Sequence, residues 1–418
     1  MNLVKEIFKS NLFKNISYLF VLQLFSYALP LVLIPFLTNT YGIYNYGKIV
    51  VAQAMMFYFM TFIDYGIHLY APNMIAQIYQ DREKLSELSF SIILLKVIFC
   101  VLGFFLLIII LKFPYFREDY NLYLISYVYV VGFSINPIWF FQGIEKMQYI
   151  TILGVLVKGI TFLLTIYFVK TSSEITLYPL INGFVTLFFS IIALFIIFRK
   201  FIDFRLRNIL GTTKKIIKDC APFFISRLSV TLYTNSNTFI LGITVGPILA
   251  GYFNIAERIY TVLLQLYQPF IQSLYPYISR TKKIDKFKFI SKWLILLNLI
   301  MILFILFFGK NIMHYFFDYE LVDNSFSVLQ ILFISLFITL PSVLIGYPLL
   351  GGFGYSKYAN RSVVFAALFH LISLYLLWLF NQISPSMVAT VLIFTQIIDL
   401  LYRIYGLKKI ALLKLLWK

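Results

Sequence analysis

Stretches of about twenty apolar residues recur along the whole chain, separated by short polar segments. A helix needs roughly 20 residues to cross the hydrocarbon core of a bilayer, so each stretch is long enough to span a membrane. Charged residues form only 12% of the chain, about half of the roughly 25% that is usual in soluble domains. The sequence therefore predicts an all-α integral membrane protein.

We count about twelve such runs. They cover residues 16–37, 48–70, 88–111, 121–141, 150–170, 177–198, 220–244, 250–275, 289–309, 325–350, 361–380 and 386–405. An even number of spans returns the chain to the side on which it began. Most of the 35 Lys and Arg residues fall in segments on the side of the N-terminus, among them 199–218 and 280–292. By the positive-inside rule, both termini are predicted to be cytoplasmic.

The net charge of +18 does not indicate a nucleic-acid partner, because the basic residues flank the predicted spans. They fit topology signals and contacts with anionic membrane lipid. Cys100 and Cys220 lie in separate apolar runs without a Cys or His at metal-ligand spacing, so we interpret both as packing residues. The sequence predicts no metal site and no catalytic residue.

Two short motifs recur at an offset of half the chain length. Gly42-Ile-Tyr-Asn-Tyr-Gly-Lys48 aligns with Gly251-Tyr-Phe-Asn-Ile-Ala-Glu257, and the same offset places residues 141–149 on residues 350–358. Repeated motifs at a constant offset indicate a duplicated unit. We predict two six-helix bundles of like topology, residues 1–209 and 210–418, that face each other across a central cavity.

Two runs carry polar residues at helical spacing. The seventh has Arg227, Thr231, Thr234 and Thr238, with Asn235 and Asn237 beside them; the eighth has Asn254, Glu257, Thr261, Gln265, Gln268 and Gln272. Residues three and four apart share one helix face, so each run is predicted to present a polar stripe to a cavity. Arg227 fits either an anion site in that cavity or an ion pair with a carboxylate such as Glu257.

Ionisable residues within the other spans have two interpretations each. Asp64 and His68 are four apart, which suits either a hydrogen-bonded pair or a protonatable site. With Glu257, these two are our candidates for coupling to an ion, because a carboxylate in apolar surroundings can exchange a proton. Lys96 and Lys158 are predicted to extend to the nearby membrane surface. Asp399 and Arg403 are predicted to form a local ion pair.

The segment Trp139-Phe-Phe-Gln-Gly-Ile-Glu-Lys-Met147 closes the fourth predicted span, and its aromatic residues fit an interfacial belt. This segment resembles one typical of bacterial polysaccharide (O-antigen repeat-unit) flippases, which belong to the multidrug/oligosaccharidyl-lipid/polysaccharide exporter superfamily. Asp64-Tyr-Gly66, Gly42–Lys48 and Gly251–Arg258 are similar to other motifs of that family. The resemblance extends over essentially the whole chain.

The resemblance implies a transporter that moves an undecaprenyl-pyrophosphate-linked oligosaccharide from the cytoplasmic to the outer leaflet of the bacterial inner membrane. It also implies no cofactor beyond possible H+ or Na+ coupling, and a polysaccharide polymerase and a chain-length regulator as possible partners besides membrane lipid. The candidates for binding pyrophosphate and sugar are Arg227, Arg258, Lys48, Thr231, Thr234, Gln265 and Gln268.

Two other functions remain open at this point. One is an ion-coupled drug or cation antiporter of the same superfamily, in which acidic cavity residues would be favoured. The other is a membrane polysaccharide polymerase or glycosyltransferase. The longest predicted outer loop, residues 310–324, contains Asp318, Glu320 and Asp323, which we interpret as a solvated loop rather than a catalytic site.

Overall fold

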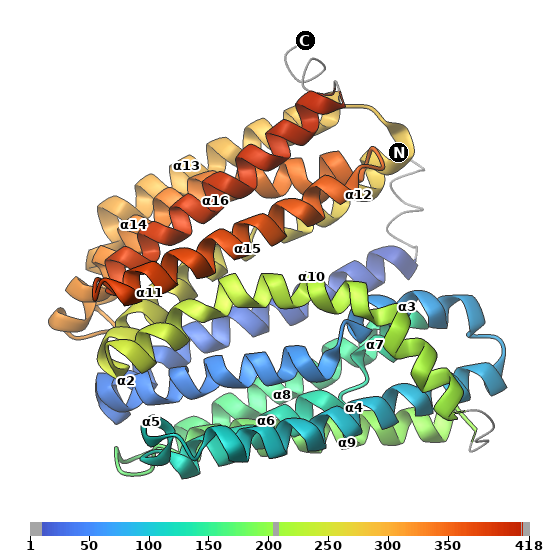
Figure 1. Ribbon diagram of the computed structural model, residues 1–418, viewed down its shortest axis with the longest axis horizontal. Coiled ribbons are helices and arrows are strands. Elements are labelled where there is room, and N and C mark those ends of the chain that lie inside the picture. Colours follow the sequence, from blue (N-terminus) through green and yellow to red (C-terminus); the bar gives the residue numbers. More distant parts are fainter. Residues whose placement is uncertain (1–10, 204–208, 411, 413–418) are drawn as a thin grey trace. The chain divides into compact units, whose positions relative to one another are not determined.

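The computed structural model describes residues 11–203, 209–410 and 412, and this part of the chain is helical without any strand. The helices are α2 (Asn11–Asp64), α3 (Ile67–Ile78), α4 (Arg82–Ile110), α5 (Pro114–Arg117), α6 (Tyr120–Ile135), α7 (Ile138–Gly143), α8 (Met147–Phe168), α9 (Leu177–Lys200), α10 (Ile209–Thr244), α11 (Pro247–Gln265), α12 (Gln268–Thr281), α13 (Asp285–His314), α14 (Tyr319–Leu344), the π-helix η1 (Ile345–Gly351), α15 (Ser356–Leu379) and α16 (Pro385–Lys409) (Figure 1). The predicted all-α class is confirmed. Both termini were predicted to lie on the cytoplasmic side of the membrane, and they fall outside the described residues.

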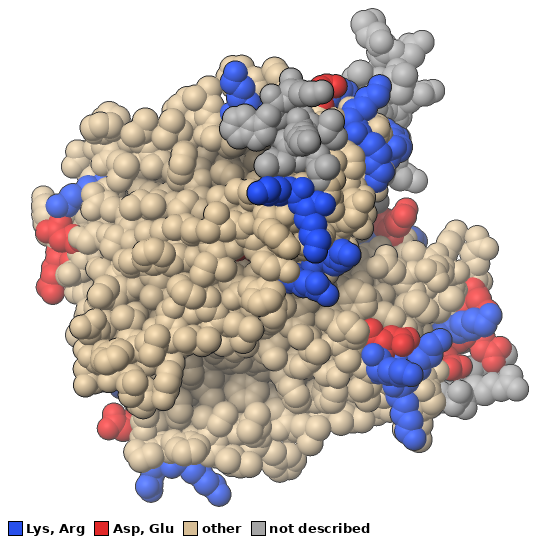
Figure 2. All heavy atoms as spheres, turned by 45° about the horizontal axis from the view of Figure 1, so that its top comes forward, with Lys and Arg blue, Asp and Glu red and all other residues tan. Residues whose placement is uncertain are grey.

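Most of the helices have the length and composition of membrane spans. Within the described residues, nine helical segments are long and apolar enough to cross a bilayer. Large apolar side chains such as Phe304, Phe307 and Phe308 on α13 are exposed, as expected of residues that contact lipid. Figure 2 shows a broad surface without charged residues, with the charged side chains gathered in separate patches. The chain is a multi-pass membrane protein.

The nine helical segments do not correspond one to one with the twelve predicted spans. One of them, Phe20–Ile78, is 59 residues long and includes a kink in α2 at Gly42, whose φ is 74°. This segment therefore contains two of the predicted spans. Helices α10, α11 and α12 are not among the nine segments, and α10 and α11 carry the polar stripes identified above. The pattern is consistent with twelve spans, and that number stays a prediction.

Four of the predicted spans are not single regular helices. The 48–70 run breaks at Tyr65 and Gly66, which have left-handed φ values of 47° and 80°. The 121–141 run breaks at Asn136-Pro137, where proline has no N–H to continue the helix. The 250–275 run breaks between α11 and α12, and the 325–350 run ends in η1. Breaks within a membrane are tolerated where protein surrounds them.

The described chain forms two compact units, each described by itself. The first unit contains residues up to Gly42 and Ala52–Thr231, and the second contains Ile43–Val51 and Leu232–Lys418. The second unit thus includes nine residues of α2, and α10 contributes to both units. These limits differ from the predicted division after residue 209, and the like topology of two six-helix halves stays a prediction.

Each unit has its own apolar core. In the first, α6 packs along α9 and α3 packs against α7. Trp139, Phe140 and Phe141 of α7 are almost fully buried in this core, so the prediction that they form an interfacial belt was wrong. Their motif packs α7 onto α3: a Cβ at Gly143 would lie 2.5 Å from Cβ of Ile75. In the second unit, α14 packs against α11, α13 and α16.

Candidate functional site

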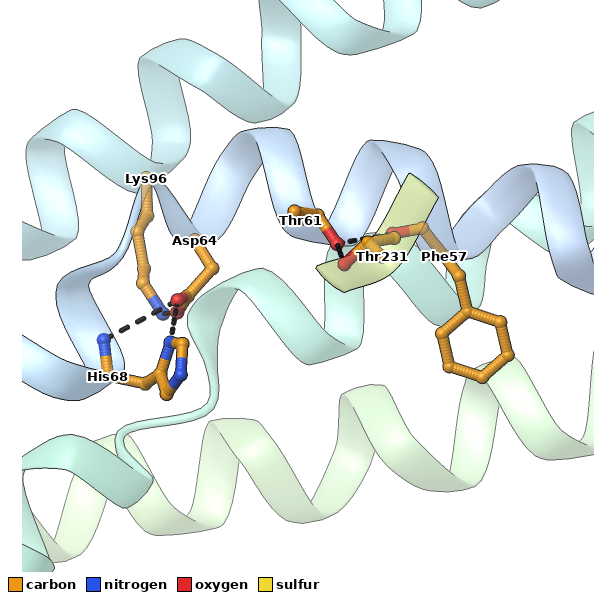
Figure 3. Close-up of polar contacts among 6 residues, drawn as sticks. All are labelled: Phe57, Thr61, Asp64, His68, Lys96 and Thr231. Carbon is orange, nitrogen blue, oxygen red and sulfur yellow. Dashed lines mark hydrogen bonds and ion pairs between the residues drawn. The ribbon is translucent and has the colours of Figure 1, made fainter. Parts of the chain in front are cut away.

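The first unit holds a group of ionisable side chains, the Asp64 cluster, formed by buried Asp64 and Lys96 and partly exposed His68 (Figure 3). The Asp64 Oδ1 atom lies 3.2 Å from Lys96 Nζ, and its Oδ2 atom contacts His68 Nδ1. The residues Asp64 and Lys96 are 5% and 4% exposed, respectively. A carboxylate of α2 and an ammonium group of α4 therefore form an ion pair between the two helices. The predicted contact between Asp64 and His68 is also confirmed.

The break between α2 and α3 positions this cluster. Asp64 is the last residue of α2, and His68 is the second residue of α3. Gly66 is needed at the break, because its φ is 80° and a Cβ there would lie 2.7 Å from Cβ of Phe223 on α10. The Tyr65 ring stacks on Phe224, with 4.6 Å between centroids. The Asp64-Tyr-Gly66 motif thus turns the chain and fits it closely against α10.

Lys96 does not extend to the membrane surface as predicted. Its ammonium group is buried beside Asp64 and lies 5.9 Å from the centroid of the Phe133 ring. A buried lysine is stabilised by an opposite charge in contact with it, and here α2 supplies that charge. The sequence interval between Asp64 and Lys96 gives no periodic signal for this pair, which is why the sequence prediction was wrong.

The second unit holds a polar group of a different kind, the Glu257 cluster, formed by Glu257, Thr238, Asn237, His370 and Thr395. Thr238 on α10 donates a hydrogen bond of 3.0 Å to Glu257 Oε2 on α11. His370 on α15 has Nε2 at 2.9 Å from Asn237 Oδ1 and Nδ1 at 2.9 Å from Thr395 Oγ1. Helices α10, α11, α15 and α16 therefore meet at this cluster.

The two copies of the glycine motif contact each other within the second unit. Tyr46 donates a hydrogen bond of 3.0 Å to Asn254 Oδ1, and both residues are buried. A Cβ at Gly47 would overlap the carbonyl group of Pro247, and a Cβ at Gly251 would lie 2.8 Å from Ile43 Cδ1. The glycines of the repeat thus allow two helix segments to pack at backbone distance. Asn254 is consequently part of this packing contact.

The polar stripe predicted for residues 250–275 is not on one helix. Gln265 ends α11 and Gln268 begins α12, with the break at Leu266 and Tyr267. Tyr267 is 1% exposed and donates a hydrogen bond of 3.0 Å to Asn298 on α13. Both glutamines are partly exposed. They flank a bend instead of extending the face that carries Glu257.

The predicted cationic residues differ in their surroundings. Arg227 on α10 is exposed and forms no ion pair with another described residue of the first unit, and its pairing with Glu257 of the second unit stays a prediction. Arg258 is partly buried beside Glu257. The Lys48 ammonium group lies 4.9 Å from the centroid of the Tyr44 ring.

The predicted threonines also separate. Thr231 is buried, and its hydroxyl group lies 3.1 Å from that of Thr61 on α2 (Figure 3). Thr234 is exposed and accepts a hydrogen bond of 3.0 Å from Asn235. Helical spacing therefore identified the polar residues of α10 without separating those that pack from those that are accessible.

The predicted ion pair between Asp399 and Arg403 is confirmed at 3.1 Å. Both residues are buried, and Arg403 also donates a hydrogen bond of 2.6 Å to the carbonyl oxygen of Ser342 on α14. Ser342 in turn donates to Asp399 Oδ2 at 2.6 Å. The pair thus holds α16 to the end of α14, directly before η1.

Sequence reasoning missed His370 and Thr395 altogether. Each is a single polar residue in an apolar helix, and neither belongs to a polar stripe. A histidine within a predicted span was the available signal, because ionisable residues are rare in membrane spans and usually have a partner. The partner was not identifiable, since Asn237 is far away in sequence.

Both units are helical, and each has an ionisable cluster among its helices. The structure is similar to an inward-facing multidrug transporter of the MATE family and MOP superfamily, with a TM-score of 0.70 and 16% identity over 92% of this chain and 95% of that chain. It is also similar to the lipid II flippase MurJ, with a TM-score of 0.68 and 15% identity over 96% and 88% of the two chains. At this identity, the likeness concerns the fold alone.

Sequence comparison gives the family. Residues 12–282 match the model of the family described as "Polysaccharide biosynthesis protein". The chain is 31% identical to a putative O-antigen transporter of Escherichia coli K12, over 90% of this chain and 93% of that protein. A putative O-antigen transporter of Shigella dysenteriae is 25% identical over 67% of this chain and 69% of its own length. The chain belongs to the polysaccharide biosynthesis protein family, which confirms the resemblance found in its motifs.

Proposed function

We propose that the protein is a flippase that moves an undecaprenyl-pyrophosphate-linked oligosaccharide, an O-antigen or capsule repeat unit, from the cytoplasmic to the outer leaflet. The observation that carries this proposal is the match over nearly the full length of a putative O-antigen transporter. The fold shared with multi-pass transporters supports it. Alternating access between the two sides of the membrane is the mechanism that we propose.

The chemistry of such a substrate requires a polar path. The polyprenyl tail can stay in the bilayer, but an unpaired pyrophosphate in hydrocarbon costs several kcal/mol at least. Exposed Arg227 and partly buried Arg258 are the candidates for binding the phosphates, because the planar guanidinium group donates two parallel hydrogen bonds to an anion. Lys48 is proposed to attract the anion nearby. Thr234, Gln265 and Gln268 are at least partly exposed and supply hydroxyl and amide groups for sugars, whereas buried Thr231 packs against Thr61.

We propose Glu257 as the first candidate for coupling to H+ or Na+. Its hydrogen bond comes from the neutral Thr238 hydroxyl group, so the carboxyl group can gain or lose a charge without breaking an ion pair. Asp64 is the second candidate, together with His68. The Lys96 ammonium group already holds the Asp64 carboxylate in its charged form, which favours a structural role for this pair.

The proposed location is the bacterial inner membrane with both termini in the cytoplasm, as the distribution of Lys and Arg indicates. A polysaccharide polymerase and a chain-length regulator are the proposed partners, because they would use the translocated repeat unit. Both proposals follow from the function and are independent of the residues assigned to the substrate.

The function is tested with purified protein in liposomes that contain a fluorescently labelled undecaprenyl-pyrophosphate-linked oligosaccharide. We expect the labelled lipid to become accessible to a membrane-impermeant quencher, and the mass of its glycan to stay unchanged. A longer glycan would identify a polymerase or glycosyltransferase instead. Flux of a cationic drug without movement of the lipid would identify an antiporter, and either result would overturn the proposal.

A further inference from the structure

His370 is fully buried, and each of its two ring nitrogens has a hydrogen-bonding partner. It is 0% exposed, as are Asn237 and Thr395. Thr395 Oγ1 donates to the carbonyl oxygen of Val391 at 2.8 Å. A hydroxyl group has one hydrogen, so while it donates to Val391 it accepts from His370 Nδ1, which must therefore carry a hydrogen.

The second ring nitrogen faces an acceptor, so it carries a hydrogen either in a cationic ring or in a neutral ring whose Nδ1 accepts from Thr395. His370 Nε2 lies 2.9 Å from Asn237 Oδ1, an atom that only accepts hydrogen bonds. A neutral ring with its hydrogen on Nδ1 has a bare Nε2, which would face this oxygen as a second acceptor. A cationic ring donates from both nitrogens and satisfies the Thr395 and Asn237 contacts together.

The amide nitrogen of Asn237 is the unsatisfied atom of the cluster. Asn237 Nδ2 is buried and forms no hydrogen bond, although leaving a buried donor unpaired costs about 1–3 kcal/mol. Thr238, the next residue on α10, donates to the Glu257 carboxyl group at 3.0 Å, which brings that group near the Asn237 side chain. One amide group therefore lies between the His370 ring and the Glu257 carboxyl group.

We propose that His370 and Glu257 form one proton-binding site whose two groups are linked by the Asn237 side chain. In one state, the ring is cationic, Asn237 Oδ1 accepts from Nε2, and the amide NH2 faces the Glu257 carboxylate. In the other, the amide is turned by half a rotation. Its NH2 then donates to a bare Nε2, and its oxygen accepts from a protonated Glu257 carboxyl group.

The same proton is bound in both states, on Nε2 in the first and on Glu257 in the second. No other covalent bond is made or broken, while the hydrogen bonds of the Asn237 amide reverse. The first state is a separated ion pair and the second is neutral. A neutral ring with its hydrogen on Nε2 is the form of the site without the shared proton: Thr395 then turns its hydroxyl hydrogen from Val391 to Nδ1 and donates to the ring. The cluster thus stores a single proton without an unpaired buried charge.

The other ionisable groups around His370 do not replace Glu257 in this role. The Tyr233 ring of α10 is 6.5 Å from the imidazole ring, measured between centroids. On α16, Asp399 and Arg403 follow Thr395 but pair with each other. Arg258 is adjacent to Glu257 in sequence and favours the charged carboxylate. Glu257 is therefore the described carboxyl group with which His370 can share a proton.

The use of this proton-binding site in transport rests on the proposed flippase function, but proton binding itself is measured without a substrate. The probe is the proton itself, in a pH titration of the full-length protein with 15N-labelled histidine in lipid nanodiscs. The chain has three histidines. Removing the other two singly, as His68→Gln and His314→Gln, assigns the remaining ring signals to His370.

We expect the His370 ring signals to titrate, and their midpoint to move in Glu257→Gln but not in the control Glu320→Gln. Glu320 is a carboxylate of the same unit at the start of α14. Asn237→Ala removes neither titrating group, and in that background Glu257→Gln should no longer move the midpoint. His370 signals that do not change with pH, or that titrate identically with and without the Glu257 carboxyl group, overturn the proposal. Failure of lipid movement in liposomes with this titration intact overturns only the flippase function.

Discussion

The two units each place a carboxylate among apolar helices and surround it differently. Asp64 in the first unit contacts the Lys96 ammonium group at 3.2 Å and the His68 ring. Glu257 in the second unit accepts its hydrogen bond from a neutral hydroxyl group. A paired buried carboxylate is costly to discharge, because its partner would be left charged and alone. A carboxylate with neutral donors can take up a proton without leaving a charged partner alone, so the two carboxylates differ in the cost of protonation.

The largest effect should come from breaking the charged pair. We expect Lys96→Met to lower the free energy of unfolding by up to about 3–5 kcal/mol, because the buried Asp64 carboxylate keeps only the His68 ring as a partner. The measurement is thermal unfolding of the purified protein in detergent. Lys158→Met is the matched control, since Lys158 is also a lysine within a predicted span but is only partly buried.

The double variant Asp64→Asn/Lys96→Met tests the reason for that loss. It removes both charges, and we expect it to unfold at a clearly higher temperature than Lys96→Met alone. If Lys96→Met is as stable as the natural protein, the first unit does not depend on its ion pair and the contrast between the two units disappears.

The second unit should depend more on close packing than on charge. We expect Gly47→Ala to lower the free energy of unfolding by about 1–3 kcal/mol, because the added Cβ overlaps the Pro247 carbonyl group and the backbone has to shift. Gly159→Ala is the control, since a Cβ at Gly159 has no atom within 4 Å. Equal unfolding temperatures for the two variants would mean that the contact between the repeated motifs adapts without cost.

Replacing each carboxylate with its neutral amide tests protein stability and the response of transport to a pH gradient separately. We expect Glu257→Gln to change the free energy of unfolding by less than about 0.5 kcal/mol, because the amide still accepts from Thr238. Lipid movement in liposomes should then lose its response to a pH gradient. Asp64→Asn should instead lower stability, because it leaves Lys96 unpaired. A stable Asp64→Asn protein that loses the gradient response would reverse the roles assigned to the two sites.

The smallest effect on stability should come from Arg227, which is exposed and has no described ion-pair partner. We expect Arg227→Ala and Arg227→Lys to unfold as the natural protein does. Surface polysaccharide in cells that lack the native gene should fall, more for Ala than for Lys, because lysine keeps the charge but loses the planar fork. Full polysaccharide with Arg227→Ala would move the phosphate site elsewhere.

The sequence by itself determined the membrane class, most of the helices and the short-range pairs. Apolar runs of sufficient length specify spans, since a helix satisfies its own backbone hydrogen bonds in lipid. The contacts of Asp64 with His68 and of Asp399 with Arg403 were predicted from the spacing of four residues. Asp399 and Arg403 are neighbours on α16, whereas Asp64 and His68 meet across the turn at Tyr65-Gly66. The motifs also indicated the family.

Only the tertiary structure decided which distant side chains meet. Lys96 pairs with Asp64, and His370 joins Asn237, across intervals that no helical period encodes. The breaks at Tyr65-Gly66 and Leu266-Tyr267 were also hidden, because apolar composition is the same on both sides of a bend. Hydrophobicity places a residue in the membrane, whereas packing between helices selects its partner. The difference between the Asp64 and Glu257 clusters therefore lies in the tertiary structure alone.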